Sequence, residues 1–170
     1  MLLRETLTPR IEHDVEEGTD RFIATIDGKP VPLRRSIFVK RVNRAINPSN
    51  KQLKKVKDEL RQHLRDCSAG LPFVADIRKS VKVDITFRCR RPQAHFTNGD
   101  RKKSVREDKQ HERHTCGDID NLIKFVLDAG NDVLFTDDRQ ICELSATIVW
   151  HGDPTSEGST TIAVQETQAG

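Results

Sequence analysis

Polar and apolar residues alternate strictly along residues 81–89, VKVDITFRC, which predicts a β-strand with one buried face. The same alternation marks residues 141–150, ICELSATIVW, as a second strand. Shorter apolar runs at residues 21–27 and 160–166 indicate two more strands, each bordered by turn-forming residues. Residues 37–46, IFVKRVNRAI, fit either a strand or a helix. The pattern therefore predicts four strands and leaves one segment open.

Two other segments carry apolar residues at every third or fourth position, the spacing of an amphipathic helix. The first covers residues 51–67 and follows NPSN, so we expect Ser49 or Asn50 to cap its start. The second covers residues 119–131, with Asp118 as the expected N-cap. The apolar stripes consist of Leu53, Val56, Leu60 and Leu64 in the first helix and of Leu122, Phe125, Val126 and Ala129 in the second.

The elements follow the order strand, helix, strand, helix, strand, strand, which lets both helices pack on one face of one sheet. We therefore expect an α+β fold with a single mixed sheet and two main helices packed on it. A chain of 170 residues is the size of one domain, which we place at residues 21–166. Residues 1–20 would form an N-terminal extension that we allow to be flexible, and residues 167–170 a tail. Residues 90–115 are polar and lack periodicity, so we expect them to form a long basic loop inserted in the domain.

The composition excludes a membrane protein. Hydrophobic residues make up 35% of the chain, charged residues 32%, and the mean hydropathy is −0.64. No run approaches the roughly 18 apolar residues of a membrane span, and the N-terminal segment lacks the apolar core of a signal peptide. The four cysteines are widely spaced, which favours a reducing compartment. We expect the bacterial cytoplasm, for a bacterial or phage-encoded protein, while a nucleus or an organelle stays open.

Positive and negative charges are segregated along the chain, although the net charge is only +3. Residues 28–67 contain 12 Lys and Arg against 3 Asp and Glu, and residues 88–114 contain 9 against 4. Residues 115–170 reverse the balance, with 2 basic and 10 acidic residues. A basic surface attracts phosphates, so on charge alone a nucleic-acid binder and an ordinary solvated face are about equally favoured.

The acidic part of the chain, residues 115–170, contains an aspartate-rich segment near its start, GDIDNLIKFVLDAGNDVLFTDDRQ at residues 117–140. Helical spacing places Asp120, Lys124 and Asp128 on one stripe of the second helix, away from its apolar side. Asp118 lies beside this stripe at the cap, where the helix dipole favours negative charge. Two carboxylates can therefore converge at the start of this helix.

A further pair of aspartates, Asp137 and Asp138, comes just before the strand at residues 141–150. If that strand neighbours the helix start, one of the pair joins Asp118 and Asp120. Three carboxylates in one place repel each other unless a cation lies between them. Their hard oxygen ligands select Mg²⁺ or Mn²⁺.

The segment GDIDNLIKFVLD followed by LFTDDRQ resembles the signature of the RusA family of Holliday junction resolvases. The family pattern is D-x-D-N-x-x-K, then an Asp four residues after the Lys, then D-D-x-Q before a strand, and every one of these positions is filled here. The similarity is close over residues 117–140 and looser over the upstream order of strand, helix and strand. The stretch at residues 92–115 is longer than the short basic link of the family.

The resemblance implies an endodeoxyribonuclease that binds four-way DNA junctions as a homodimer and makes paired symmetric nicks in DNA recombination and repair. By position, it assigns the catalytic and metal-binding carboxylates to Asp118, Asp120 and Asp138 and the essential lysine to Lys124, with Mg²⁺ or Mn²⁺ as the cofactor. The remaining motif positions have no assigned role: Asn121, Asp128, Asp137 and Gln140.

Basic residues outside the motif are the candidates for phosphate contacts, because no base-specific reader stands out and a junction is recognised mainly by its shape. The candidates are Lys54, Lys55 and Lys57 in the first helix, Arg88, Arg90 and Arg91 near the end of the strand at residues 81–89, and Arg101, Lys102 and Lys103 in the inserted loop.

Two alternatives to a nuclease remain open. The first is a zinc-stabilised DNA-binding module, since His111, His114 and Cys116 lie close together in the chain, although their spacing matches no known zinc signature. A further ligand for that zinc site would have to come from Cys89, His95, Cys67 or His63. The second alternative is a protein that binds branched DNA without cleaving it.

Overall fold

The computed structural model describes residues 10–14, 19–34, 37–39, 44–67, 69–96, 116–153 and 155–167. The strands in these ranges are β1 (Arg10–Asp14), β2 (Thr19–Asp27), β3 (Ile37–Val39), β4 (Arg44–Ile46), β5 (Ser80–Cys89), β6 (Ile141–Trp150) and β7 (Gly158–Thr167). The helices are α1 (Asn50–Asp66) and α2 (Ile119–Gly130), with short 3-10 turns η2 (Gln93–His95) and η4 (Asp138–Gln140).

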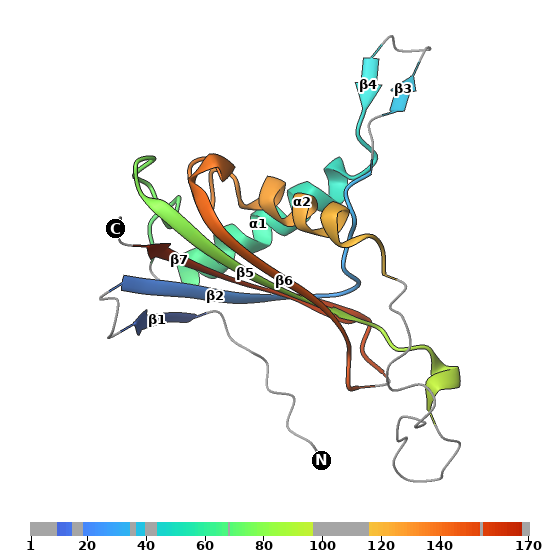
Figure 1. The fold of residues 1–170 in the computed structure, drawn as a ribbon. Coiled ribbons are helices and arrows are strands. Elements are labelled where there is room, and N and C mark those ends of the chain that lie inside the picture. Colours follow the sequence, from blue (N-terminus) through green and yellow to red (C-terminus); the bar gives the residue numbers. More distant parts are fainter. Residues whose placement is uncertain are drawn as a thin grey trace.

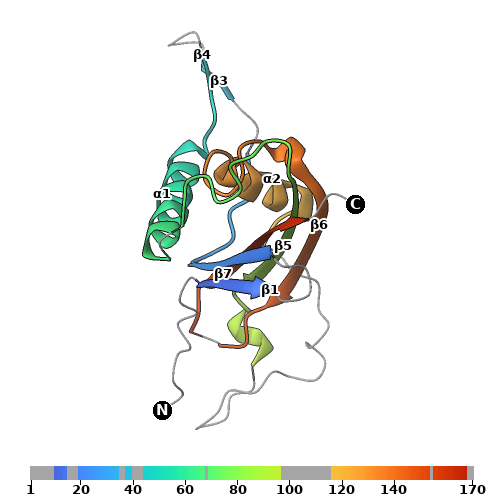
Figure 2. The ribbon, with the colours of Figure 1, turned by 90° about the vertical axis from the view of Figure 1, so that its left-hand side faces the viewer.

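Five of the strands form one sheet in the order β1-β2-β7-β5-β6. Neighbouring strands are antiparallel except for β5 and β6, which run parallel and are connected by a crossover through α2. Both helices lie on the same face of the sheet (Figures 1 and 2). This single mixed sheet covered by two helices confirms the predicted α+β fold.

The core lies between the helices and the sheet, and β5 shows why the sequence folds this way. Every second residue of β5 is buried, and the residues between them are half-exposed on the opposite face. Its buried residues face the helices, and two of them stand opposite apolar residues of β7, in the pairs Val83 with Val164 and Ile85 with Ile162. The helices contribute mainly Leu60 and Leu64 of α1 and Leu122, Phe125, Val126 and Ala129 of α2.

One glycine is required where β7 begins. Gly158 has a φ of +111°, in the region that side chains with a Cβ rarely adopt. A Cβ at this position would lie 2.5 Å from the backbone oxygen of Arg88, so the close pairing of β7 with β5 also requires its absence.

The predicted boundaries of the helices and strands agree with the observed ones to within two residues, and the structure adds two details. Ser49 does occupy the N-cap position of α1, but its hydroxyl accepts a hydrogen bond from the backbone N–H of Arg34 rather than from the helix. Within the expected N-terminal extension, Arg10–Asp14 forms β1 and pairs with β2. The reason is that β2 would otherwise leave its outer backbone groups unpaired.

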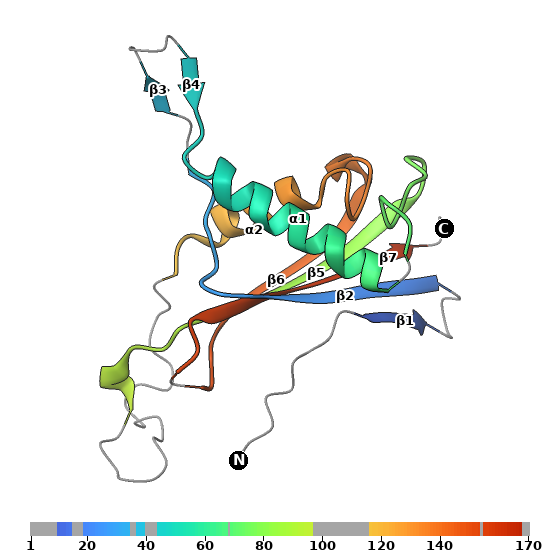
Figure 3. The same ribbon diagram turned by 180° about the vertical axis from the view of Figure 1, so that it is seen from behind.

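The segment that the sequence left open is a hairpin of β3 and β4, in which Phe38 stands opposite Ala45. This hairpin projects away from the sheet and the helices (Figure 3). Within the described ranges, no helix is long and apolar enough to cross a membrane.

Candidate active site

Helix α2 separates its chemistry from its packing as the sequence predicts. Leu122, Phe125 and Val126 are buried against the sheet, while Asp120 and Lys124 are exposed on the other side of the helix. Asp128, one turn further along the same stripe, is half-buried. The carboxylates and the lysine therefore share one outward-facing surface.

The backbone before α2 sets where this surface begins. Gly117 has a φ of +128°, and a Cβ added to it would lie 3.4 Å from the ring of Pro32. Asp118 follows as the N-cap residue, but its carboxylate makes no capping hydrogen bond to the helix. Asp118 and Asp120 are both exposed at this end, so their oxygens are open to solvent.

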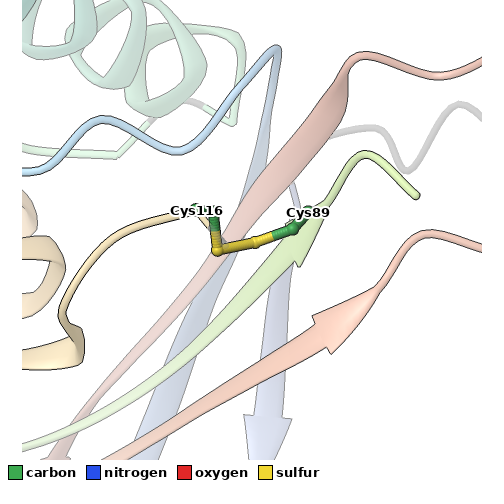
Figure 4. The surroundings of a disulfide bond; sticks show 2 residues. All are labelled: Cys89 and Cys116. Carbon is green, nitrogen blue, oxygen red and sulfur yellow. A yellow bond between two sulfur atoms is a disulfide. The ribbon is translucent and has the colours of Figure 1, made fainter. Parts of the chain in front are cut away.

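A disulfide between Cys89 and Cys116 connects the end of β5 to the residue just before Gly117 (Figure 4). The two Cα atoms are 6.0 Å apart, and both side chains are buried. The bond therefore joins the start of α2 covalently to the sheet. Sequence reasoning favoured a reducing compartment and did not foresee this bond, because a sequence separation of 27 hides the proximity of the two cysteines.

The disulfide bears on the zinc alternative. Cys116 and Cys89 have no free thiolate while they are bonded to each other. His111 and His114 lie outside the described residues. The structure therefore offers no support for a zinc site built on Cys116.

The turn between α2 and β6 distinguishes the two adjacent aspartates of the motif. The Asp137 carboxylate accepts hydrogen bonds from the backbone N–H of Arg139 at 2.9 Å and from its guanidinium at 2.9 and 2.8 Å. These hydrogen bonds hold the pKa of Asp137 well below its usual range. Asp138 is exposed. The Asp137 carboxylate is thus engaged in hydrogen bonds with Arg139, whereas Asp138 is exposed to solvent.

Asp138 lies near the end of α2 rather than near its start. The pKa of Asp128 is raised by its partial burial, is lowered by the positive charge of Lys124 and is raised again by the negative charge of Asp138. These interactions place Asp128 within electrostatic range of both Lys124 and Asp138. The 3-10 turn that contains Asp138 also contacts α2.

Within the described residues, Asp118, Asp120 and Asp138 do not form one cluster. No group of three His, Cys, Asp or Glu side chains in the described part of the chain is close enough to hold a metal ion. The reason is the length of the helix, since residues 120 and 128 are about 12 Å apart at 1.5 Å per residue. Asp138 lies near the Asp128 end of the helix.

The candidates for phosphate contacts are distributed over different surfaces. Lys54 and Lys55 are exposed on α1, and Lys57 forms an ion pair with Asp132 at 3.4 Å. Arg88 lies on the sheet face opposite the helices, where its guanidinium donates to the Thr161 hydroxyl.

The two arginines that follow β5 are already engaged. Arg90 forms an ion pair with Glu157 at 2.5 Å. Arg91 is only 8% exposed, with its guanidinium carbon 5.3 Å from the ring centre of Trp150, and this burial lowers its pKa. Its expected role at a DNA surface is not supported, because the stacking removes it from solvent. Arg101, Lys102 and Lys103 lie outside the described residues.

Sequence reasoning did not single out Arg139, although it neutralises one aspartate of the motif. The signal was present as the spacing Asp–x–Arg, in which an aspartate accepts from the backbone two residues later and the arginine side chain folds back onto it. The same arrangement occurs at Asp76 and Arg78, with hydrogen bonds of 3.0, 3.0 and 2.8 Å.

A cavity of about 180 Å³ lies on the other side of α2, between the helices and the sheet. Its walls are mainly apolar and include Phe87, Phe125 and Ile162, with Lys29 and Lys55 among the polar residues. Because Phe125 faces away from the aspartates, the cavity is separate from the carboxylate surface. The candidate active site is therefore an open surface, which suits a large substrate.

A family model described as "Endodeoxyribonuclease RusA" matches residues 27–163, most of the chain. The chain belongs to the RusA endodeoxyribonuclease family. The resemblance found in the aspartate motif is thereby confirmed over a much longer stretch, which includes both helices, β5, β6 and most of β7. No individual curated protein matches the sequence. As a member of the RusA family, the protein is a nuclease of the Holliday junction resolvase type.

Proposed function

We propose that this RusA-family protein is a metal-dependent, structure-specific endodeoxyribonuclease that resolves Holliday junctions by paired symmetric nicks. The observation that carries the proposal is the outward face of α2, which presents Asp118, Asp120 and Lys124 together in a motif of the family. Asp138 supplies a further exposed carboxylate near the other end of the helix.

We infer that the cofactor is Mg²⁺ or Mn²⁺. The donor atoms are exposed carboxylate oxygens, the ligands that these cations prefer, and Mg²⁺ usually binds one or two carboxylates together with waters and substrate phosphate. Three converging side chains are therefore not required, and the arrangement fits such a cation. Asp118 and Asp120 would hold it at the start of α2, and Asp138 would bind a cation near the other end of the helix. When bound, the cation lowers the pKa of water and neutralises charge on the phosphate.

Lys124 is the cation that the chain itself supplies to this surface. It is exposed between Asp120 and Asp128, one turn from each. In this proposal its ammonium group contacts the scissile phosphate or orients the attacking water. The alternative is a simple ion pair with its neighbouring aspartates, which contributes only a few tenths of a kcal/mol on an exposed helix.

Paired cuts require two copies of this site, so we propose that the protein acts as a homodimer. The expected result of sedimentation analysis at micromolar concentration is a particle of twice the 19.4 kDa chain. The proposed setting is the cytoplasm of a bacterium, with the protein encoded by the cell or by a phage. Because the chain contains the Cys89–Cys116 disulfide, nuclease assays need a reduced and an oxidised sample.

The deciding experiment compares a synthetic four-way junction with a linear duplex of the same sequence, each with Mg²⁺ and with EDTA. We expect symmetric nicks in two opposite strands of the junction, in the presence of Mg²⁺ only, and their loss in Asp120→Asn. Asp132→Asn is the matched control, because Asp132 is an exposed aspartate outside the motif with a φ of 60°, which asparagine tolerates. Junction binding without cleavage in any cation would instead identify a non-catalytic junction-binding protein.

A further inference from the structure

Gln140, the last residue of the 3-10 turn η4, is buried and hydrogen-bonded at both ends of its amide. Its exposed fraction is 6%. Its Oε1 accepts a hydrogen bond from the backbone N–H of Asp137 at 2.9 Å. Its Nε2 donates to the backbone oxygens of Asp76 at 3.0 Å and of Lys79 at 3.2 Å. One side chain thus connects the segment before β6 with the segment before β5.

These hydrogen bonds determine the shape of the turn that contains the two adjacent aspartates. Asp137 and Gln140 form a reciprocal cap, in which the Asp137 carboxylate in turn accepts from Arg139. With Asp137 engaged in this way, Asp138 is the carboxylate that the turn presents to solvent. The direction of the Asp138 side chain follows from the backbone of the turn. Hydrogen bonds of Gln140 and Arg139 to Asp137 hold this backbone in place.

The turn also contacts α2, and Asp138 interacts electrostatically with Asp128 there. A shift of the turn relative to β5 would therefore move Asp138 relative to Lys124 and Asp128. Beside it, the Thr136 hydroxyl donates to the backbone oxygen of Ala75 at 2.9 Å and also connects these two segments. That hydrogen bond precedes Asp137, so it does not involve the residues of the turn itself.

We propose that Gln140 is a positioning residue of the nuclease, which holds Asp138 beside the Lys124 and Asp128 face of α2 by bonding the η4 turn to the backbone of Asp76 and Lys79. This inference rests on the proposed function of the carboxylate surface. Gln140 touches neither substrate nor cation and acts through Asp138. A glutamine is required because only an amide accepts from one backbone N–H while it donates to two backbone oxygens.

Two substitutions test the hydrogen bonds made by the Gln140 side chain. Gln140→Met keeps the length of the side chain and removes all three. Gln140→Glu changes a single group, retains an acceptor for the Asp137 N–H and loses both donors when ionised, so it serves as the second variant if Gln140→Met fails to fold. Thr136→Val is the matched control, because it removes the neighbouring hydrogen bond between the same two segments without altering the turn.

Four properties are measured: single-turnover cleavage of the four-way junction, binding of the junction in EDTA, the Mg²⁺ concentration for half-maximal cleavage, and hydrogen exchange of the Asp137 amide. For Gln140→Met we expect cleavage to fall about 10- to 100-fold, as for a misplacement of about 1 Å in an active site. The half-maximal Mg²⁺ concentration should rise, junction binding should change less than twofold, and the Asp137 amide should exchange faster. Thr136→Val should cleave within about twofold of the wild type.

A double variant distinguishes positioning from general loosening. If Gln140 acts through Asp138, adding Gln140→Met to Asp138→Asn produces little further loss of residual cleavage, because the two residues act as one unit. A purely structural role predicts that the two losses multiply and that Thr136→Val resembles Gln140→Met. Either of these results, or wild-type cleavage by both Gln140 variants, overturns the positioning role. Absence of cleavage by the wild-type protein in every cation would overturn the proposed function itself.

Discussion

The two ends of α2 carry similar carboxylates but are held in place by different interactions. At the start, the Cys89–Cys116 disulfide joins the helix covalently to β5. The backbone N–H of Leu33 also donates a hydrogen bond to the backbone oxygen of Asn121, at 2.9 Å. These contacts involve the backbone and the core, and they leave the Asp118 and Asp120 side chains exposed.

At the other end, the carboxylates interact with one another and with cationic groups. Asp128 is half-buried and within electrostatic range of Lys124 and Asp138. The turn that carries Asp138 depends on hydrogen bonds made by Asp137 and Gln140. The difference shows that the helix start presents exposed carboxylates on a covalently fixed base, while its end presents a carboxylate whose position depends on a polar network.

The largest expected effect is on catalysis at the helix start. Asp120→Asn should reduce junction cleavage about 1000-fold, the upper range for removal of one group from a preorganised site. Asp128→Asn should reduce it only about 10-fold, because Asp128 is partly buried beside Lys124 and has less access to substrate. Single-turnover rates with Mg²⁺ measure both. Equal losses in the two variants would show that the two ends act as one site.

The second effect is on the stability of the helix start. Cys89→Ser combined with Cys116→Ser should lower the free energy of unfolding by about 3–4 kcal/mol, since the disulfide spans a sequence separation of 27 residues. Denaturant titration of the oxidised protein measures this loss. The control is Cys67→Ser combined with Cys142→Ser, which removes the two free cysteines and should have little effect. An unchanged unfolding free energy in the first variant would show that packing alone holds this end.

The third effect is on packing at the helix end. A Cβ added to Gly130 would lie 2.9 Å from the Phe135 ring, which is buried, so Gly130→Ala should lower the free energy of unfolding by about 1–3 kcal/mol. Gly70→Ala is the control, because a Cβ there meets no atom within 4 Å. If thermal unfolding shows no difference between the two, the end of α2 is more adaptable than its contacts suggest.

The smallest effect concerns the loop to which Gln140 is bonded. Hydrogen bonds from Arg78 lower the pKa of Asp76 from 3.8 to about 2. A carboxyl group whose pKa is lowered on folding stabilises the protein above its unfolded pKa, and this contribution disappears as the pH falls through the folded pKa. The unfolding free energy should therefore decrease from pH 4 to pH 2 by a smaller amount in Asp76→Asn than in the wild type. Identical pH profiles would contradict a role for this carboxylate.

Local patterns were sufficient for most of the fold. The alternation in β5 and the apolar stripes of both helices arise from interactions between residues that are near in the chain, and these elements lie where the sequence predicts them. The hairpin of β3 and β4 could not be assigned, because a short run of mixed apolar and basic residues has no clear period. β1 escaped notice because its pairing with β2 is a property of the sheet.

For the candidate site, the sequence by itself determined the motif, the surface of α2 on which Asp120 and Lys124 lie, and membership in the RusA family. Helical periodicity is enough to place residues four apart on one side. Only the tertiary structure decided that Asp138 lies beside Asp128 rather than beside Asp118, because that choice depends on how the turn before β6 packs against the helix. It likewise decided the Cys89–Cys116 bond and the burial of Arg91, since both depend on contacts between segments distant in the chain.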